Sequence, residues 1–373
     1  MDNPFKKLFP SLNVLGEPDE SAVGVDIGTS SIKVVEIKKK KGKAVLQTYG
    51  AISLGPYAGA DAGRVTNLSV EKTSEALLEV LKQSGIGVGS AAFSIPVQSS
   101  LIFMIELPSQ LKESEIPTIV PTEARKYIPV PISEVAINYF VLPKKAASFE
   151  EANNPDASLA SEKTQVLVVA TQNDAVARYK SIVLQSKMEA SFYEIETFSS
   201  IRASFEHELS LVLLMDFGAS RTKLSLVEFG MVKNSHTINR GGADVSASIS
   251  QSLSIPFAEA EKMKKEFGLL GNNKDQSFSD IIQVHLNYIF SETNNVLLSY
   301  ERAHDRTISK VILTGGGALL KGLKEKAEEN FKTEIEIGNS FSKVGSPAFL
   351  KKVLENMGPE FAVSLGLALR KLQ

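Results

Sequence analysis

The chain has 373 residues, of which 43% are hydrophobic and 23% charged, and its formal net charge is −2. These fractions are typical of a folded globular protein long enough for two or more domains, and they exclude a disordered or fibrous chain. The near-neutral charge predicts no nucleic-acid partner. The absence of cysteine excludes disulfides, thiolate metal sites and a cysteine nucleophile, and favours a reducing, cytoplasmic compartment.

The N-terminal residues 1–21 are polar and lack the apolar core of a signal peptide, so we expect a flexible leader. Within it, residues 5–9 have the composition of a small amphipathic surface anchor, but Pro4 and Pro10 bracket them too closely for a helix. The longest apolar runs are too short to cross a bilayer. We therefore expect a cytoplasmic protein that meets a membrane only indirectly, through a partner.

Three strand-like segments follow, at 23–27, 32–38 and 43–52, and their short turns predict an antiparallel meander. The lysine-rich stretch 38–43 contains Gly42, which favours a solvated hairpin tip over a binding patch. The apolar spacing over 70–84 predicts a helix. Together these elements form the first part of a domain at 22–90.

Residues 91–144 are expected to form an inserted subdomain with strands at both ends. The stretch between the strands is helix-like except for Pro117 and Pro121, and an interior proline costs about 3 kcal/mol. We expect the helix to start near Pro121 or to break there. The following residues, 145–163, are poor in apolar side chains and predict a flexible loop.

The rest of the chain repeats the plan of a meander followed by helices and strands. A strand and a helix at 164–205 continue the first domain, and 206–350 form a second domain. The expected elements of that second domain are strands at 211–216, 222–228 and 231–239, a helical region at 244–267 interrupted near Pro256, and a helix at 280–304. A closing helix within 351–373 is expected to pack back on the first domain. The repeat predicts a duplicated α/β fold with a cleft between the copies.

One motif, Asp-x-Gly-x-Ser-x-x-Lys, follows an apolar strand in both halves, at Asp26 and again at Asp216. Glycine at the third position lets a ligand approach the backbone, and the turn amides predict anion-binding nests. The predicted phosphate-binding residues are Gly28, Thr29, Ser30 and Ser31 in the first turn and Gly218, Ala219 and Ser220 in the second. The two aspartates fit Mg²⁺ held mainly through water.

Lys33 and Lys223 end the two motifs within strands, where each either approaches phosphate or faces solvent, and Lys33 is the better candidate. A single motif of this kind indicates only a hairpin turn. Two copies in matched strand–turn–strand contexts favour a phosphate clamp. A third turn, LTGGGALLKGL at 313–323, adds Gly315, Gly316 and Gly317, which favour a flat ligand group lying against the backbone. It matches neither a Walker A loop nor a Rossmann turn.

The order of DIGTSSIK, DFGASRTK and LTGGGALLKG resembles the actin-like ATPase superfamily. This resemblance implies an α/β, actin-like fold of two ribonuclease H-like domains with ATP and Mg²⁺ in the cleft between them. AEKMKKEFG resembles the segment in which Glu261 and Lys264 would contact ribose and adenine. FYEIETFSSIRA resembles a connecting helix in which Glu196 would orient the attacking water. Glu196 can equally be structural, so the question of a weak ATPase stays open.

Within this superfamily, LPSQLKESEI…EARKYIPVPISEVAINYFVL resembles the subdomain shared by the FtsA and PilM families, and it is more similar to PilM. Chains of the FtsA type continue beyond the closing helix to a membrane anchor, whereas Gln373 follows it here. The PilM resemblance implies a scaffold of a type IV pilus or related secretion platform. It would bind the N-terminal cytoplasmic peptide of a PilN-like inner-membrane protein at 91–144, and it leaves self-association open. An FtsA-like division protein and an actin-fold sugar or acetate kinase remain alternatives.

Overall fold

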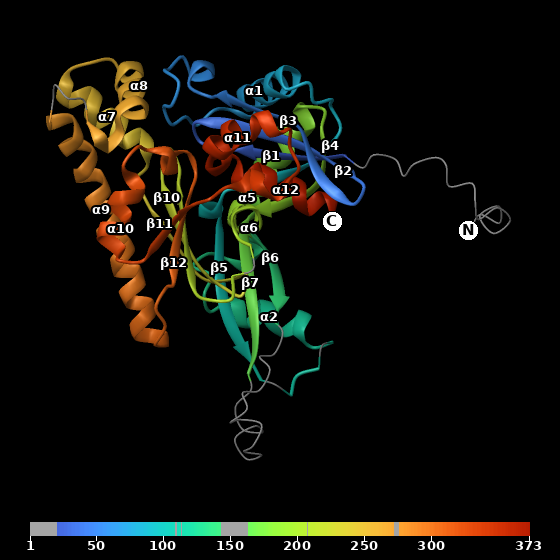
Figure 1. Ribbon diagram of the computed structural model, residues 1–373. Helices are drawn as coiled ribbons and strands as arrows, with labels where there is room; N and C mark the ends of the chain where they lie inside the picture. Colours follow the sequence, from blue (N-terminus) through green and yellow to red (C-terminus); the bar gives the residue numbers. More distant parts are fainter. Residues whose placement is uncertain (1–20, 109, 113, 143–162, 207, 272–275) are drawn as a thin grey trace.

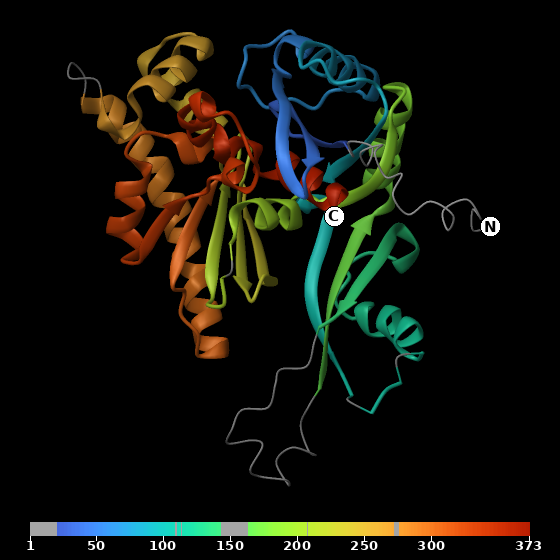
Figure 2. The same cartoon turned by 45° about the vertical axis from the view of Figure 1, so that its right-hand side comes forward.

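The computed structural model describes the chain outside residues 1–20, 109, 113, 143–162, 207 and 272–275 (Figure 1). The expected leader and nearly all of the expected loop at 145–163 therefore lie outside the described residues. The described part contains two five-stranded sheets and one three-stranded sheet. In Figure 2 the two five-stranded units stand side by side, and the three-stranded sheet extends from the first of them.

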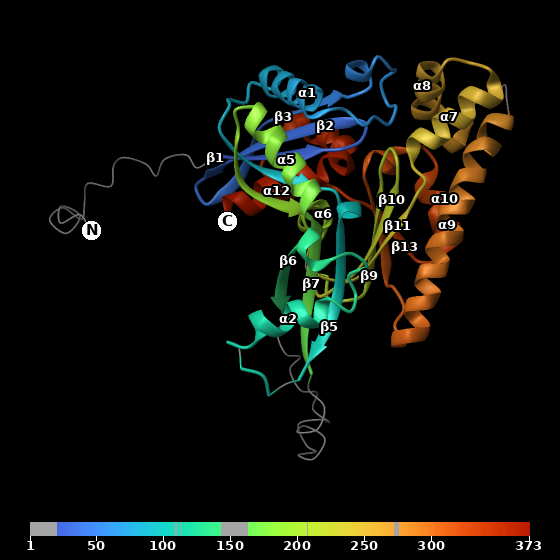
Figure 3. The ribbon, with the colours of Figure 1, turned by 180° about the vertical axis from the view of Figure 1, so that it is seen from behind.

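The first five-stranded sheet has the order β3-β2-β1-β4-β8. Its strands are β1 (Ser21–Ile27), β2 (Ser31–Lys40), β3 (Lys43–Ser53), β4 (Ser90–Ile95) and β8 (Glu189–Ile195). The predicted meander is confirmed, because β1, β2 and β3 pair antiparallel, and β4 and β8 add to it in parallel. Helices α1 (Val70–Gln83) and α5 (Asn173–Gln185) cover one face, which Figure 3 shows from behind.

The second five-stranded sheet has the equivalent order β11-β10-β9-β12-β13. Its strands are β9 (Val212–Phe217), β10 (Thr222–Glu228), β11 (Met231–Ile238), β12 (Lys310–Thr314) and β13 (Glu334–Ile337). The helices of this half are α7 (Gly242–Leu253), α8 (Phe257–Phe267), α9 (Gln276–His304) and α10 (Leu323–Phe331). The break near Pro256 is confirmed, and α9 begins four residues earlier than expected. The matching strand orders are those of a duplicated unit.

The three-stranded sheet has the order β5-β7-β6, with β5 (Ser100–Leu107), β6 (Val135–Val141) and β7 (Thr164–Gln172) all antiparallel. Sheet membership therefore differs from the expected division of the chain. β4, expected in the subdomain, is a buried strand of the first sheet, because its apolar run suits a parallel neighbour on each side. β7, expected in the first domain, is the central strand of the subdomain sheet.

Helix α2 (Ile116–Ala124) covers one face of the three-stranded sheet and contains both prolines of this region. Pro117 lies in the first turn, where a missing N–H breaks no helical hydrogen bond. The helix continues through Pro121, so the prediction that it starts or breaks there was wrong. The burial of Ile116, Val120 and Ala124 in the subdomain core holds the helix together despite the missing bond at Pro121.

The C-terminal helices α11 (Lys351–Met357) and α12 (Ala362–Leu372) follow the second domain and pack on the first sheet. On that face α12 crosses both β1 and α6 (Glu196–Ser204) at close range. A Cβ at Gly24 of β1 would lie 2.0 Å from the Ser364 carbonyl oxygen, and one at Gly366 would lie 1.9 Å from that of Ser199. Glycine at 24 and 366 is therefore required for α12 to reach the sheet and α6.

Candidate functional site

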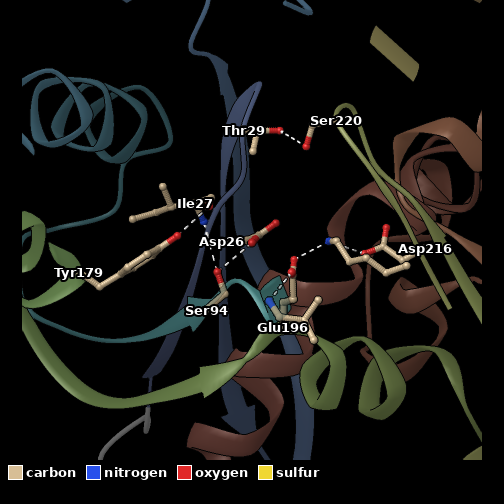
Figure 4. Close-up of polar contacts among 10 residues, drawn as sticks. Asp26, Ile27, Thr29, Ser94, Tyr179, Glu196, Asp216 and Ser220 are labelled. Atoms are coloured by element: carbon tan, nitrogen blue, oxygen red, sulfur yellow. Dashed lines mark hydrogen bonds and ion pairs between the residues drawn. The ribbon is translucent and has the colours of Figure 1, made fainter. Parts of the chain in front are cut away.

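Two equivalent hairpin turns face each other between the five-stranded sheets. In the first hairpin Asp26 lies opposite Lys33 on the neighbouring strand, and in the second Asp216 lies opposite Lys223. In each turn the glycine amide donates to the carbonyl three residues on, at 3.0 Å in both copies. The turns meet where Thr29 Oγ1 donates to Ser220 Oγ at 3.2 Å (Figure 4). The repeated motif thus forms two opposed jaws in direct contact.

The jaws border a cavity of about 580 Å³. The structure brings every predicted site residue to its lining, namely Asp26, Gly28, Thr29, Ser30, Ser31, Lys33, Glu196, Asp216, Gly218, Ala219, Ser220, Glu261, Lys264, Gly315, Gly316 and Gly317. A volume of this size is typical of small-molecule and cofactor sites. Residues from both halves of the chain are needed to enclose it.

The start of α7 supports the second jaw, a contact that the motifs alone did not predict. The amides of Gly242 and Ala243 donate to the carbonyls of Gly218 and Ala219, each at 2.9 Å. A Cβ at Gly241 would lie 2.4 Å from the Ala219 carbonyl oxygen, so only glycine permits this approach. The sequence did contain a signal for this contact. Gly241 and Gly242 stand at the start of a helix, and Asp244 caps that helix by accepting the Gly241 amide.

Two of the three glycines in the turn after β12 are required by close packing within the protein. Gly315 has a φ of +79°, and a Cβ there would lie 2.3 Å from Asp216 Oδ1. A Cβ at Gly317 would lie 2.4 Å from the ring of Phe217. Gly316 alone of the three has ordinary space, because a Cβ there would lie 3.6 Å from its nearest neighbour, Glu360 Oε1. Of the three glycines expected to lie against a flat ligand group, only Gly316 has a Cβ position free of close contacts.

A buried ion-pair group forms one wall of the cavity. Lys223 Nζ lies 2.6 Å from Glu196 Oε2 and 2.9 Å from Asp216 Oδ2. The other carboxylate oxygen of Glu196 accepts the amide of Val97 at 2.9 Å. The strand position of Lys223 left open that its side chain faces solvent. The structure shows instead that it is largely buried and paired. No local sequence pattern indicates this contact, because Glu196 and Lys223 come from different domains.

The electrostatics of this group follow from burial and mutual contact. Burial raises the pKa of Glu196, and the nearby carboxylates of Asp216 and Asp26 raise it further against the opposing effect of Lys223. Burial lowers the pKa of Lys223, but Asp216 and Glu196 outweigh it, so the pKa lies above its ordinary value. The lysine is therefore charged at neutral pH.

The first jaw is held differently, by neutral partners. Ser94 Oγ donates to Asp26 Oδ1 at 2.8 Å and accepts the Ile27 amide at 3.3 Å (Figure 4). Tyr179 Oη donates to the Ile27 carbonyl at 3.3 Å. Lys33 lines the cavity and forms no ion pair with a residue that the structure describes. The first-copy lysine is thus available to an anionic ligand, whereas the second-copy lysine is engaged.

Glu261 and Lys264 of α8 line the cavity and contact each other. Lys264 Nζ lies 2.6 Å from Glu261 Oε2 and donates to the Gly242 carbonyl at 2.8 Å. Ser246 Oγ donates to the same carboxylate oxygen of Glu261 at 2.5 Å. Although burial opposes it, Lys264 holds the pKa of Glu261 below its ordinary value. These bonds fix α8 against α7 and position both side chains at the cavity.

Within the part of the chain that the structure describes, the cavity lining includes five acidic side chains and no histidine, the acidic ones being Asp26, Glu196, Asp216, Glu261 and Glu360. Across the described residues, no group of three or more His, Cys, Asp or Glu is placed to hold a metal ion. A metal here would depend on ligand phosphates and water, and Asp26 is a cavity carboxylate without an ion pair to a described lysine. The described helices include none that is both long and apolar enough to cross a membrane.

The family model of type IV pilus assembly protein PilM matches residues 24–372. The chain belongs to this family. The division protein FtsA of Staphylococcus epidermidis is 23% identical over 355 residues, covering 84% of this chain and 73% of that relative. FtsA of Pseudomonas aeruginosa is 22% identical over 386 residues, covering 94% and 89%. These similarities support the predicted FtsA/PilM branch.

Solved structures support the fold. A structure of the PilM-PilN type IV pilus biogenesis complex matches with a TM-score of 0.78 and 23% identity, covering 95% of this chain and all of that one. The ethanolamine utilization protein EutJ of Carboxydothermus hydrogenoformans matches with a TM-score of 0.52 and 17% identity, covering 95% and 90%. Together with the two matched sheets, these similarities confirm the predicted actin-like, two-domain α/β fold.

Proposed function

We propose that this PilM-family chain binds ATP with Mg²⁺ in the cavity between its two five-stranded sheets. The observation that carries the proposal is the pair of opposed turns joined by Thr29 and Ser220. Residues of both turns line one cavity, where their backbone amides would suit a chain of phosphates. The positive end of α7 lies behind the second turn and adds to the attraction for anions.

The residues present fit a magnesium nucleotide. Asp26 is held by Ser94 and has no lysine partner among the described residues, so its charge can orient the water shell of a phosphate-bound Mg²⁺. Asp216 would act from the other side, although one of its oxygens is bound to Lys223. Lys33 would contact phosphate oxygens, and Gly316 would leave room for the base. Glu261 and Lys264 would contact the nucleoside. When bound, Mg²⁺ would neutralise phosphate charge and fix the phosphate geometry.

Hydrolysis is proposed to be slow. Both carboxylate oxygens of Glu196 are already engaged, one by Lys223 and one by the Val97 amide. Each oxygen can accept a second hydrogen bond, but these two partners take up lone pairs and part of the negative charge that Glu196 would use to hold the attacking water. Turnover on the order of 10⁻³ per second, typical of a nucleotide switch without its activator, is expected in phosphate-release measurements. Turnover above about 1 per second, the range of kinases, would instead favour the small-molecule kinase alternative.

We further propose that the chain acts as a cytoplasmic scaffold of a pilus assembly platform. The partner would be the N-terminal cytoplasmic peptide of a PilN-like inner-membrane protein, which would hold the chain at the inner face of the cytoplasmic membrane. Family membership and the similarity to a PilM-PilN complex support this proposal. The three-stranded subdomain would contribute to the docking site. A pull-down with that peptide, with and without Mg-ATP, tests it, and absence of capture in both conditions would contradict it.

Calorimetric titration with Mg-ATP tests the nucleotide site. Binding by the full chain is expected to weaken at least tenfold in Asp26→Asn and to be lost in Gly316→Val, whose side chain would enter the cavity. The matched control is Gly87→Val, because Gly87 has nothing within 4 Å of its Cβ position and does not line the cavity. No heat with the wild-type chain, or equal affinity in all three variants, would refute the proposal.

A further inference from the structure

The hairpin between β2 and β3 carries five lysines around its tip, which we call the lysine tip: Lys38, Lys39, Lys40, Lys41 and Lys43. The turn uses Lys41 at a φ of 49° and Gly42 at 75°, as a two-residue hairpin turn requires. All of these lysines except Lys38 are exposed. None of them forms an ion pair with a residue that the structure describes.

Two features of the lysine tip destabilise the hairpin that carries it. Lys40 and Lys43 are direct cross-strand partners, and like charges in that position destabilise a hairpin. Lys41 occupies a left-handed backbone position that Asn or Gly would adopt with less strain. The whole chain has 41 basic and 43 acidic residues, so solubility alone does not call for one unbroken basic run. An external anion would compensate the repulsion.

The lysine tip lies at the end of the first sheet away from the cavity. In register, Lys38 pairs with Ser21 at the start of β1, whereas Asp26 is near its other end. Figures 1 and 3 both place the tip beside the C-terminus and on the side opposite α8 and α9.

We propose that the lysine tip is a contact site for an anionic phospholipid surface. A charged bilayer attracts every lysine near it, each contributing about fivefold in affinity, and needs no groove or shaped pocket. Nucleic acid fits less well, because residues 38–43 contain no arginine or aromatic side chain and the chain as a whole is negative. The contact would be direct and independent of nucleotide and peptide binding.

Vesicle flotation of the purified full chain tests the proposal. We expect flotation with phosphatidylcholine vesicles containing about one third phosphatidylglycerol at about 0.05 M salt, and loss of flotation at about 0.5 M. The triple variant Lys39→Glu, Lys40→Glu, Lys41→Glu should reduce binding at least tenfold. The matched control changes Lys180, Lys187 and Lys262 to Glu, with Lys187 again at a positive φ of 53°. It should float like the wild type.

Three outcomes would overturn the proposal. They are no flotation by the wild type, equal flotation with pure phosphatidylcholine, and equal loss in the tip and control variants. Fluorescence anisotropy with a random-sequence DNA duplex at the same salt gives a further check. Equally tight binding to the duplex would show a non-specific polyanion patch and would remove the assignment to lipid. Because Mg-ATP titration of the same variants reports on the cavity separately, failure here would leave the nucleotide site untouched.

Discussion

Lys223 of β10 contacts Glu196 at the start of α6 across the boundary between the two domains, with 2.6 Å between Nζ and Oε2. The same lysine binds Asp216 of its own hairpin, and the same glutamate accepts the amide of Val97. Val97 lies between β4 and the three-stranded sheet. One carboxylate thus joins the second domain, the first domain and the chain that enters the subdomain.

The variant Lys223→Met is expected to destabilise the protein by about 3 kcal/mol, because it leaves two buried carboxylates without their counter-charge. Chemical denaturation measures the effect. The matched control is Lys33→Met, the equivalent position in the first hairpin, which forms no ion pair with a described residue and should change stability by less than about 0.5 kcal/mol. Equal losses in both variants would contradict the asymmetry of the two jaws.

A second buried carboxylate, Glu194, gives a prediction about acid stability. Burial raises its pKa, but hydrogen bonds from Arg202, Ser199 and Arg370 outweigh burial and hold the pKa below the ordinary value of 4.5. A lowered folded-state pKa stabilises the fold above the unfolded value, and this contribution is lost as the pH falls through the folded value. Glu194→Gln should therefore cost about 2 kcal/mol at pH 7 and much less near pH 3.

Denaturation curves at both pH values test the Glu194 prediction. The control is Glu189→Gln, an exposed position on the same strand, which is expected to change stability by less than about 0.5 kcal/mol at either pH. A Glu194→Gln deficit that stays constant or grows towards acid pH would show that its ionic contacts do not stabilise the fold.

The crossing of α12 over α6 gives a packing prediction. Gly366→Ala would place a Cβ 1.9 Å from the Ser199 carbonyl oxygen, so the helices must separate, at a cost of about 3 kcal/mol. Gly87→Ala is the control, because open space surrounds its Cβ position. The unfolding free energies of the two variants should differ by about this amount. A difference close to zero would mean that α12 shifts without cost.

Helix α2 gives a prediction in the stabilising direction. Pro121→Ala would restore a backbone N–H inside the helix and should raise the stability of the subdomain by about 1 kcal/mol. Pro117→Ala should bring no such gain, because Pro117 lies in the first turn. Hydrogen exchange of the α2 amides, together with the denaturation midpoint, would measure the difference. A loss of protection in Pro121→Ala would show that the proline ring itself is needed for packing in the subdomain core.

Local sequence patterns identified the two jaws because each is a short hairpin whose residues are neighbours in the chain. The motif starting at Asp26 and its repeat at Asp216 fold into turns with the same register and the same hydrogen bond. The resemblance to the PilM family came from the segment at 91–144, and the family is confirmed. The course of α2 through Pro121 was not predictable in this way, because burial of the whole helix outweighed the local preference of one residue.

The sequence by itself determined the duplicated plan and the two repeated hairpin turns, since periodicity and turn chemistry act over a few residues. The family resemblance added Glu196, Glu261 and Lys264, which also line the cavity. Only the tertiary structure decided which sheet takes β4 and β7, and that Lys223 pairs with Glu196. It also decided that Gly315 and Gly317 serve packing against the second jaw. These features depend on contacts between segments distant in the chain, where burial and charge compensation outweigh local preference.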